Sequence, residues 1–183
     1  WSDRDEGIFP SMTERAKAAG KSAGVVTTVQ WSHATPAGFS NAHESERDNY
    51  ESIARQMISG SVLDVIMGCG NPDFDNNGRP AMKQRESKYV GGTQSWKDIE
   101  TARSKADETF KGFRPVSTKS EFEALATGPT PPRVLGTVQV RTTLRQAREG
   151  KDTGDPAKET PVNPDLPDLP LMVRAAINVL DEN

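Results

Sequence analysis

The sequence of 183 residues predicts an α/β fold that holds part of a doubly wound sheet with long loop insertions. Two apolar, β-branched runs at residues 24–29 and 63–68 alternate with amphipathic helical segments, which is typical of this fold class. Apolar residues make up only 33% of the chain, which also contains 15 glycines and 13 prolines. A core this thin for the length leaves two interpretations open, a loop-rich domain or a part of a larger fold whose other core strands lie elsewhere.

Local signals predict the first elements in order. Residues 1–9 are polar and indicate a loop. Ser11 and Glu14 have the spacing of a capping box for a helix over 10–19, which Gly20 ends, and the first strand follows. After it, Pro36 disfavours a helical residue before it, so an extended segment is expected that turns His33 and Thr35 to one side.

The second half of the chain predicts shorter elements between long connections. A helix over 49–58 places four apolar residues on one face and leads through the strand at 63–68 into a loop over 71–95. The residues around 128–132 are a proline-rich connector, and 149–170 contains five prolines and is expected to be exposed. The remaining predicted elements are helices at 96–110, 119–126 and 169–180 and strands at 113–116 and 133–140.

Composition excludes several classes of function. No run approaches the ~20 apolar residues that a membrane-spanning helix needs. A pI of about 5.5 and dispersed Lys and Arg argue against a nucleic-acid surface. Cys69 is the single cysteine, so the chain can build neither an internal disulfide nor a thiolate metal cluster, and a small buried residue is the favoured interpretation.

The most informative stretch extends from residue 18 to residue 47. It reads Ala-Ala-Gly-Lys-Ser-Ala-Gly-Val-Val-Thr-Thr over 18–28, His-Ala-Thr-Pro-Ala over 33–37, and then Ala42-His43 and Arg47. This order of elements closely resembles the alkaline phosphatase family. Asp-Val-Ile-Met-Gly-Cys-Gly at 64–70 and the segment at 166–180 also resemble elements of that family. The resemblance covers most of residues 9–183 and implies an alkaline-phosphatase-like sheet.

The resemblance implies a role for four residues. Thr35 matches the hydroxyl that helps to hold the family's magnesium site, and oxygen ligands suit this hard cation. His33 matches a position at the same site that is aspartate or histidine, where histidine favours a nitrogen-tolerant ion or a water-mediated contact. Arg47 matches the arginine that grips the substrate phosphate with its planar fork. His43 matches a histidine beside that arginine.

The resemblance also implies what lies outside the chain. The family's nucleophilic serine lies in a D-S-A motif, which does not occur in this sequence. Its magnesium glutamate lies in a V-E-G-G strand after the final helix, and its zinc ligands lie on both sides of this segment. His33 and His43 are the only histidines, so the chain cannot build the two zinc sites. We therefore expect a middle segment of an alkaline phosphatase that is inactive alone.

The expected organisation is one partial domain over 1–183. Residues 9–70 form the half with the metal and phosphate sites, 71–168 a loop-rich insertion region, and 169–183 the helix before a missing strand. The parent enzyme would use magnesium and two zinc ions to hydrolyse phosphate monoesters through a phosphoserine. Its expected partners are the remaining segments of the enzyme and a possible second copy, in the periplasm or outside the cell, with neither nucleic acid nor a membrane as a partner.

Several interpretations stay open beside this one. Without the resemblance, His33 would be a loop histidine and Arg47 a solvated surface residue. Asp73, Asp75 and Asn77 match the first half of a calcium loop over 73–84, but Gln84 stands at the twelfth position, where the bidentate Glu belongs, so a turn is favoured. The alternative functions are a related hydrolase of the same superfamily, such as a phosphodiesterase or sulfatase-like enzyme, and a non-catalytic calcium-binding or interaction module.

Overall fold

The computed structural model describes residues 2–3, 7–83, 86–105, 109–148 and 160–181, and it contains a four-stranded parallel sheet in the order β3-β4-β6-β5. A two-stranded antiparallel pair, β1-β2, precedes it. The elements are β1 (Ser2–Asp3), β2 (Gly7–Ile8), α1 (Met12–Ala18), β3 (Gly24–Gln30), α2 (Ala34–Gly38), α3 (Tyr50–Met57), β4 (Val65–Cys69), the 3-10 turn η1 (Lys88–Val90), α4 (Thr93–Ser104), β5 (Arg114–Val116), α5 (Lys119–Thr127), β6 (Val134–Thr137) and α6 (Leu169–Asp181).

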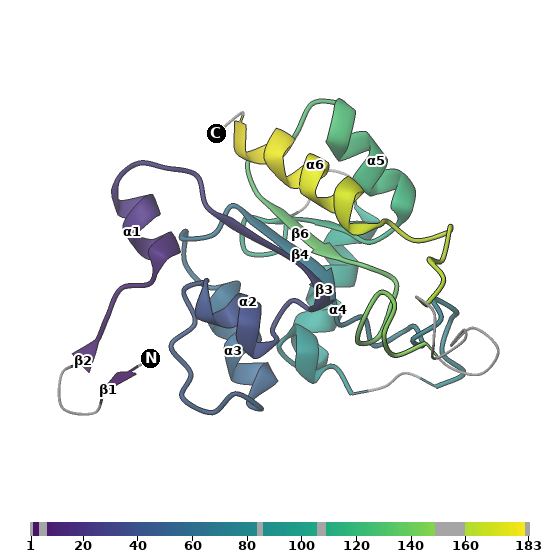
Figure 1. Ribbon diagram of the computed structural model, residues 1–183, viewed down its shortest axis with the longest axis horizontal. Helices are drawn as coiled ribbons and strands as arrows, with labels where there is room; N and C mark the ends of the chain where they lie inside the picture. The colour runs from purple at the N-terminus through teal and green to yellow at the C-terminus, as the bar shows by residue number, and fades with distance from the viewer. Residues whose placement is uncertain (1, 4–6, 84–85, 106–108, 149–159, 182–183) are drawn as a thin grey trace.

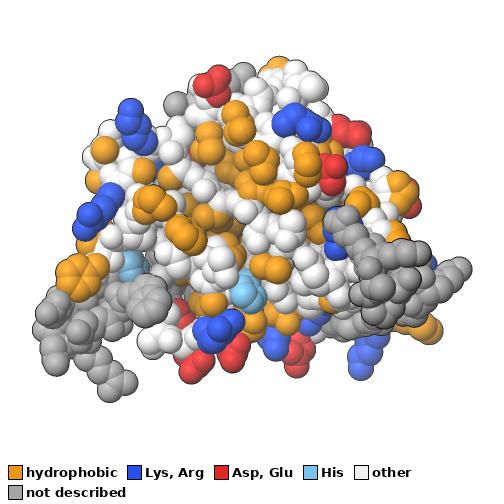
Figure 2. Space-filling view, in the orientation of Figure 1, with side chains coloured by type: hydrophobic (Ala, Val, Ile, Leu, Met, Phe, Trp, Pro, Cys, Tyr) orange, Lys and Arg blue, Asp and Glu red, His pale blue; other side chains and the backbone are white. Residues whose placement is uncertain are grey.

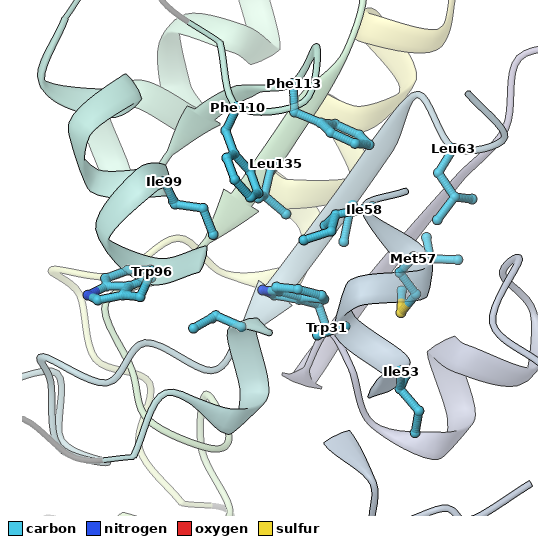
Figure 3. Close-up of a cluster of buried hydrophobic side chains, with 14 of the residues drawn as sticks. Trp31, Ile53, Met57, Ile58, Leu63, Trp96, Ile99, Phe110, Phe113 and Leu135 are labelled. Atoms are coloured by element: carbon cyan, nitrogen blue, oxygen red, sulfur yellow. The ribbon is translucent and has the colours of Figure 1, made fainter. Parts of the chain in front are cut away.

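Helices cover both faces of the sheet (Figure 1), as a doubly wound fold requires. The pleat of β4 divides its buried side chains between two cores: Ile66 lies in one, and Val65 and Met67 lie in the other. The first core contains Trp31 and side chains from α3 and α4 (Figure 3). The second core packs α5 and α6 against the opposite face. Cys69 is buried here, which agrees with its predicted structural role.

Strand β3 lies at one edge of the sheet. Among the described residues it pairs with β4 alone, and its residues 26–29 are only half-buried. On α6, three exposed apolar side chains recur at every fourth position, namely Leu169, Val173 and Ile177. Apolar side chains also gather on the upper part of the face shown in Figure 2. No helix in the described part of the chain has the length and apolar character to cross a membrane.

Two local predictions were wrong. The segment 1–9, predicted as a loop, contains the paired strands β1 and β2. The segment 32–38, predicted to be extended, contains helix α2. Pro36 lies in the first turn of α2, where its missing N–H costs no helical hydrogen bond, and the His33 side chain caps the turn. The helix predicted at 96–110 spans Thr93–Ser104 instead, and residues 106–108 lie outside the described part.

A substitution at Gly68 tests how closely β4 packs against β3. A Cβ at this position would lie 2.8 Å from Thr27 Cγ2 and 2.8 Å from the Val29 carbonyl oxygen, and the backbone oxygen cannot rotate away. Gly68→Ala should therefore lower the free energy of unfolding by about 1–3 kcal/mol, measured by urea unfolding followed by tryptophan fluorescence. Gly38→Ala is the matched control, because beyond the adjacent residues and the backbone of its own helix no atom lies within 4 Å of the added Cβ. A Gly68→Ala chain as stable as the parent would contradict this packing.

Candidate functional site

The predicted site residues lie beyond the carboxyl end of β3, the edge where open α/β sheets bind ligands. His33 is the N-cap of α2, and its Nδ1 accepts a hydrogen bond from the Thr35 backbone N–H at 3.3 Å. Its other ring nitrogen, Nε2, makes no hydrogen bond to a residue that the structure describes. The ring is thus oriented through one nitrogen, and the other is available to a ligand.

The electrostatic surroundings of His33 bring Arg47 into the same site. Partial burial lowers the pKa of His33 because it disfavours the imidazolium ion, and the positive charge of Arg47 lowers it further. The Asp48 carboxylate opposes both effects. The net lowering of the pKa favours the neutral imidazole, which is the form that binds a metal ion.

Arg47 lies on an exposed loop and lines a cavity of about 420 Å³. The cavity wall is mixed: Ala34 and Ala37 of α2 and Ile53 of α3 are apolar, and Glu44 is the acidic residue that lines it. Arg47 makes no hydrogen bond or ion pair within the described parts of the chain. An arginine whose fork of donors is unused is suited to binding an anion such as a phosphate group.

Thr35 does not share this cavity. Its exposed side chain lines a second cavity of about 410 Å³, together with Val25, Thr27 and Phe39 along the open edge of β3. The structure therefore brings His33 and Arg47 within electrostatic range of each other, and it places Thr35 toward the sheet edge on another cavity.

His43 contacts a residue that the sequence analysis assigned only to helix capping. Its Nε2 lies 3.0 Å from both carboxylate oxygens of Glu14, and its backbone N–H donates to Gln56 Oε1 at 2.7 Å. Partial burial opposes ionisation of Glu14, but hydrogen bonds from Ser11 and His43 outweigh it and lower the pKa of Glu14. The spacing of Ser11 and Glu14 predicted a capping box, but no local signal could predict the contact between Glu14 and a histidine 29 residues away.

A second group of aromatic and basic side chains was missed by the sequence analysis. The rings of Tyr50 and Tyr89 meet edge to face with centroids 4.8 Å apart, and Tyr50 also lies 6.5 Å from His33. Lys88 Nζ lies 5.8 Å and 5.5 Å from the two tyrosine rings, and the Arg141 guanidinium stacks over Tyr89 at 4.8 Å. The charge of Arg47 also acts on Tyr50, so this group adjoins the candidate site.

The two aspartates of the candidate calcium loop accept hydrogen bonds from the protein itself. Asp73 Oδ2 accepts from the Trp96 indole at 2.8 Å, and Asp75 Oδ1 accepts from the backbone N–H groups of Asn77 and Arg79 at 2.8 and 2.9 Å. These contacts are typical of a turn. Gln84 lies outside the described residues, and within them no group of three or more His, Cys, Asp or Glu could hold a metal. Calcium binding stays the less favoured alternative to a turn, and a calcium titration would test it.

A parallel sheet with helices on both faces, and with His33 and Arg47 beyond the carboxyl end of one strand, has the ligand-binding edge of an open α/β protein. The family model described as alkaline phosphatase matches residues 3–183. The chain belongs to the alkaline phosphatase family, which confirms the resemblance carried by residues 18–47.

Two curated relatives come from Bacillus subtilis (strain 168). Alkaline phosphatase 3 is 37% identical over 87 residues, which cover 45% of this chain and 19% of that protein. Alkaline phosphatase 4 is 36% identical over 103 residues, which cover 52% of this chain and 22% of that protein. The chain thus matches only about a fifth of the length of these relatives.

Solved structures show the same fold. The cold-active alkaline phosphatase from a psychrophilic Shewanella species superposes with a TM-score of 0.61 at 23% identity, over 99% of this chain and 34% of that one. The Thermus thermophilus alkaline phosphatase gives a TM-score of 0.55 at 25% identity, over 91% of this chain and 28% of that one. These superpositions confirm the predicted fold class.

The effect of Arg47 on His33 can be measured directly. Arg47→Gln removes a positive charge that disfavours the imidazolium ion, so the pKa of His33 should rise. Proton NMR titration in the presence of EDTA can follow the rings of the only two histidines. Arg55→Gln removes an arginine that pairs with Glu51 and should leave the His33 midpoint unchanged. An unchanged midpoint in the Arg47 variant would show that its guanidinium does not act on His33.

Proposed function

We propose that residues 1–183 form a segment of a metal-dependent alkaline phosphatase that hydrolyses phosphate monoesters through a phosphoserine intermediate. The observation that carries the proposal is Arg47, which makes no hydrogen bond or ion pair among the described residues and lies within electrostatic range of His33 at the carboxyl edge of the sheet, in a chain of this family. The chain supplies the phosphate-binding arginine and part of the magnesium site.

Arg47 binds and orients the phosphate group. Its planar guanidinium can donate two parallel hydrogen bonds to phosphoryl oxygens, which fixes the orientation of the group as well as its position. The same donors stabilise negative charge as it redistributes over the phosphoryl oxygens in the transition state. Because Arg47 has no competing partner among the described residues, it does not have to break an ion pair before it binds substrate.

The residues present suit a part of a metal site. The exposed Thr35 hydroxyl is an oxygen ligand, and the neutral His33 ring has Nε2 available because Nδ1 is engaged by the Thr35 N–H. Carboxylate ligands would have to come from elsewhere, since the described residues contain no cluster of acidic and histidine groups. When bound, the family's metal ions would stabilise the attacking and leaving oxygens.

Other segments of the enzyme would complete the site. In this proposal they supply the nucleophilic serine and the zinc ligands, and the chain of 183 residues alone is inactive. The one-sided pairing of β3 and the exposed apolar residues of α6 support further segments packed against this edge. The proposal includes export of the enzyme to the periplasm or beyond and a possible homodimer, both from the family resemblance.

Arg47→Ala tests the proposal in the complete polypeptide that contains this chain. Loss of the phosphate grip should lower kcat/KM for a phosphate monoester by about 10²–10³-fold and weaken inhibition by inorganic phosphate. Arg174→Ala, an exposed arginine on α6, is the matched control and should leave both values unchanged. Unchanged kinetics in Arg47→Ala would overturn the role of Arg47. A preference for diesters or sulfate esters, or phosphatase activity in the isolated chain, would overturn the proposed function.

A further inference from the structure

Side chains tie helix α1 to the rest of the molecule at both of its ends. Near its C-terminus, Lys17 Nζ donates to both carboxylate oxygens of Asp64 at 2.7 and 2.8 Å. Near its N-terminus, Glu14 binds the His43 ring. Figure 1 shows α1 beside the sheet edge, apart from the helical layers that cover the two faces of the sheet. These two contacts therefore help to fix the position of α1.

The Glu14 carboxylate has two functions at once. One oxygen, Oε2, accepts the Ser11 backbone N–H at 2.7 Å and completes the capping box of α1. Both oxygens lie 3.0 Å from His43 Nε2. The two side chains are largely shielded from water, with 16% of the His43 side chain and 26% of the Glu14 side chain exposed. A charge-assisted contact with this burial is stronger than an exposed ion pair.

His43 in turn holds the loop that carries Arg47. Its backbone N–H donates to Gln56 Oε1 at 2.7 Å, which attaches the start of the loop to α3. At the other end of the loop, Asn49 caps α3 through Ser52 N and donates to Glu44 Oε2 at 3.0 Å. Arg47 lies between these anchors, four residues after His43 and two before Asn49.

We propose that Glu14 is a positioning residue for Arg47. It acts by holding the His43 ring, which fixes the start of the loop and the direction from which the guanidinium meets the substrate phosphate. Neither the capping box nor the family resemblance gave Glu14 this role. The inference rests on the proposed function, because it assigns to Glu14 an effect on the phosphate grip.

Glu14→Gln is the informative substitution. Glutamine can still accept the Ser11 N–H, since Glu and Gln serve equally in a capping box, but it loses the negative charge that faces His43. In the complete polypeptide that contains this chain, kcat/KM for a phosphate monoester should fall about tenfold, because displacement of a positioned group by a fraction of an ångström weakens catalysis. The inhibition constant of inorganic phosphate should rise by a similar factor, while the melting temperature changes little.

Two controls separate positioning from loosening of α1. Lys17→Gln removes the other tether of α1 and leaves Asp64 buried without its cation, so it should lower the melting temperature but weaken phosphate binding much less than Glu14→Gln does. Ser11→Ala removes the hydroxyl that accepts a hydrogen bond from the Glu14 backbone N–H, and it leaves the contact between the Glu14 carboxylate and the His43 ring in place. If either control weakens phosphate binding as much as Glu14→Gln does, Glu14 acts only through helix stability and the inference is wrong.

A double-mutant cycle with Arg47→Ala completes the test. If Glu14 acts through Arg47, Glu14→Gln should have no further effect on phosphate inhibition once the arginine is gone. Full additivity of the two substitutions would overturn the inference. The cycle also keeps the two proposals apart: an inert Arg47→Ala removes the phosphate-binding role of Arg47 and the positioning role with it, whereas an effective Arg47→Ala with an inert Glu14→Gln removes only the positioning role.

Discussion

The buried carboxylate of Asp64 is the contact on which the rest of the sheet depends. Its side chain is nearly inaccessible to water, and it accepts hydrogen bonds from Lys17 of α1 and from the backbone N–H of Ala23, just before β3. The backbone carbonyl of Asp64 also accepts from the N–H of Val134, at the start of β6. One residue therefore aligns the amino ends of three strands and one helix. Because a buried charge is costly without partners, these contacts strongly favour a single register.

That alignment determines what meets at the opposite edge of the sheet. Because the strands are parallel, their carboxyl ends lie at the same edge of the sheet, and the residues after β3, β4 and β6 therefore lie along that edge. His33 follows β3, Asn71 follows β4 and Arg141 follows β6. Asn71 is buried and Arg141 stacks over Tyr89, so most of this edge is filled by protein side chains. Arg47 and Thr35 differ, since each lines a cavity open to a ligand or to further protein.

Most of the fold could be predicted from the sequence because its signals are local. The strands predicted at 24–29 and 63–68 occur as Gly24–Gln30 and Val65–Cys69, and the capping box at Ser11 and Glu14 is present. Helix α2 was missed because the rule for residues before proline was weighed without the side-chain cap that His33 provides. The separate cavities of Thr35 and Arg47 could not be predicted, because they depend on how α2 packs between β3 and the loop at 42–47.

The contacts that are hardest to predict from the sequence are the ones that hold the loop carrying Arg47. A flexible exposed arginine would bind a phosphate group only after losing the conformational freedom of its loop, and this loss weakens binding. Here hydrogen bonds hold the loop in the absence of a ligand. His43 contacts Glu14 and Gln56 at one end of the loop, and Asn49 contacts Glu44 and caps α3 at the other. The arginine itself has no partner among the described residues. A free guanidinium on an anchored loop is the arrangement that preorganised anion recognition requires. If Arg47 binds phosphate as proposed, the long-range contacts of Glu14 and Gln56 would therefore matter for the site as much as the motif that contains Arg47.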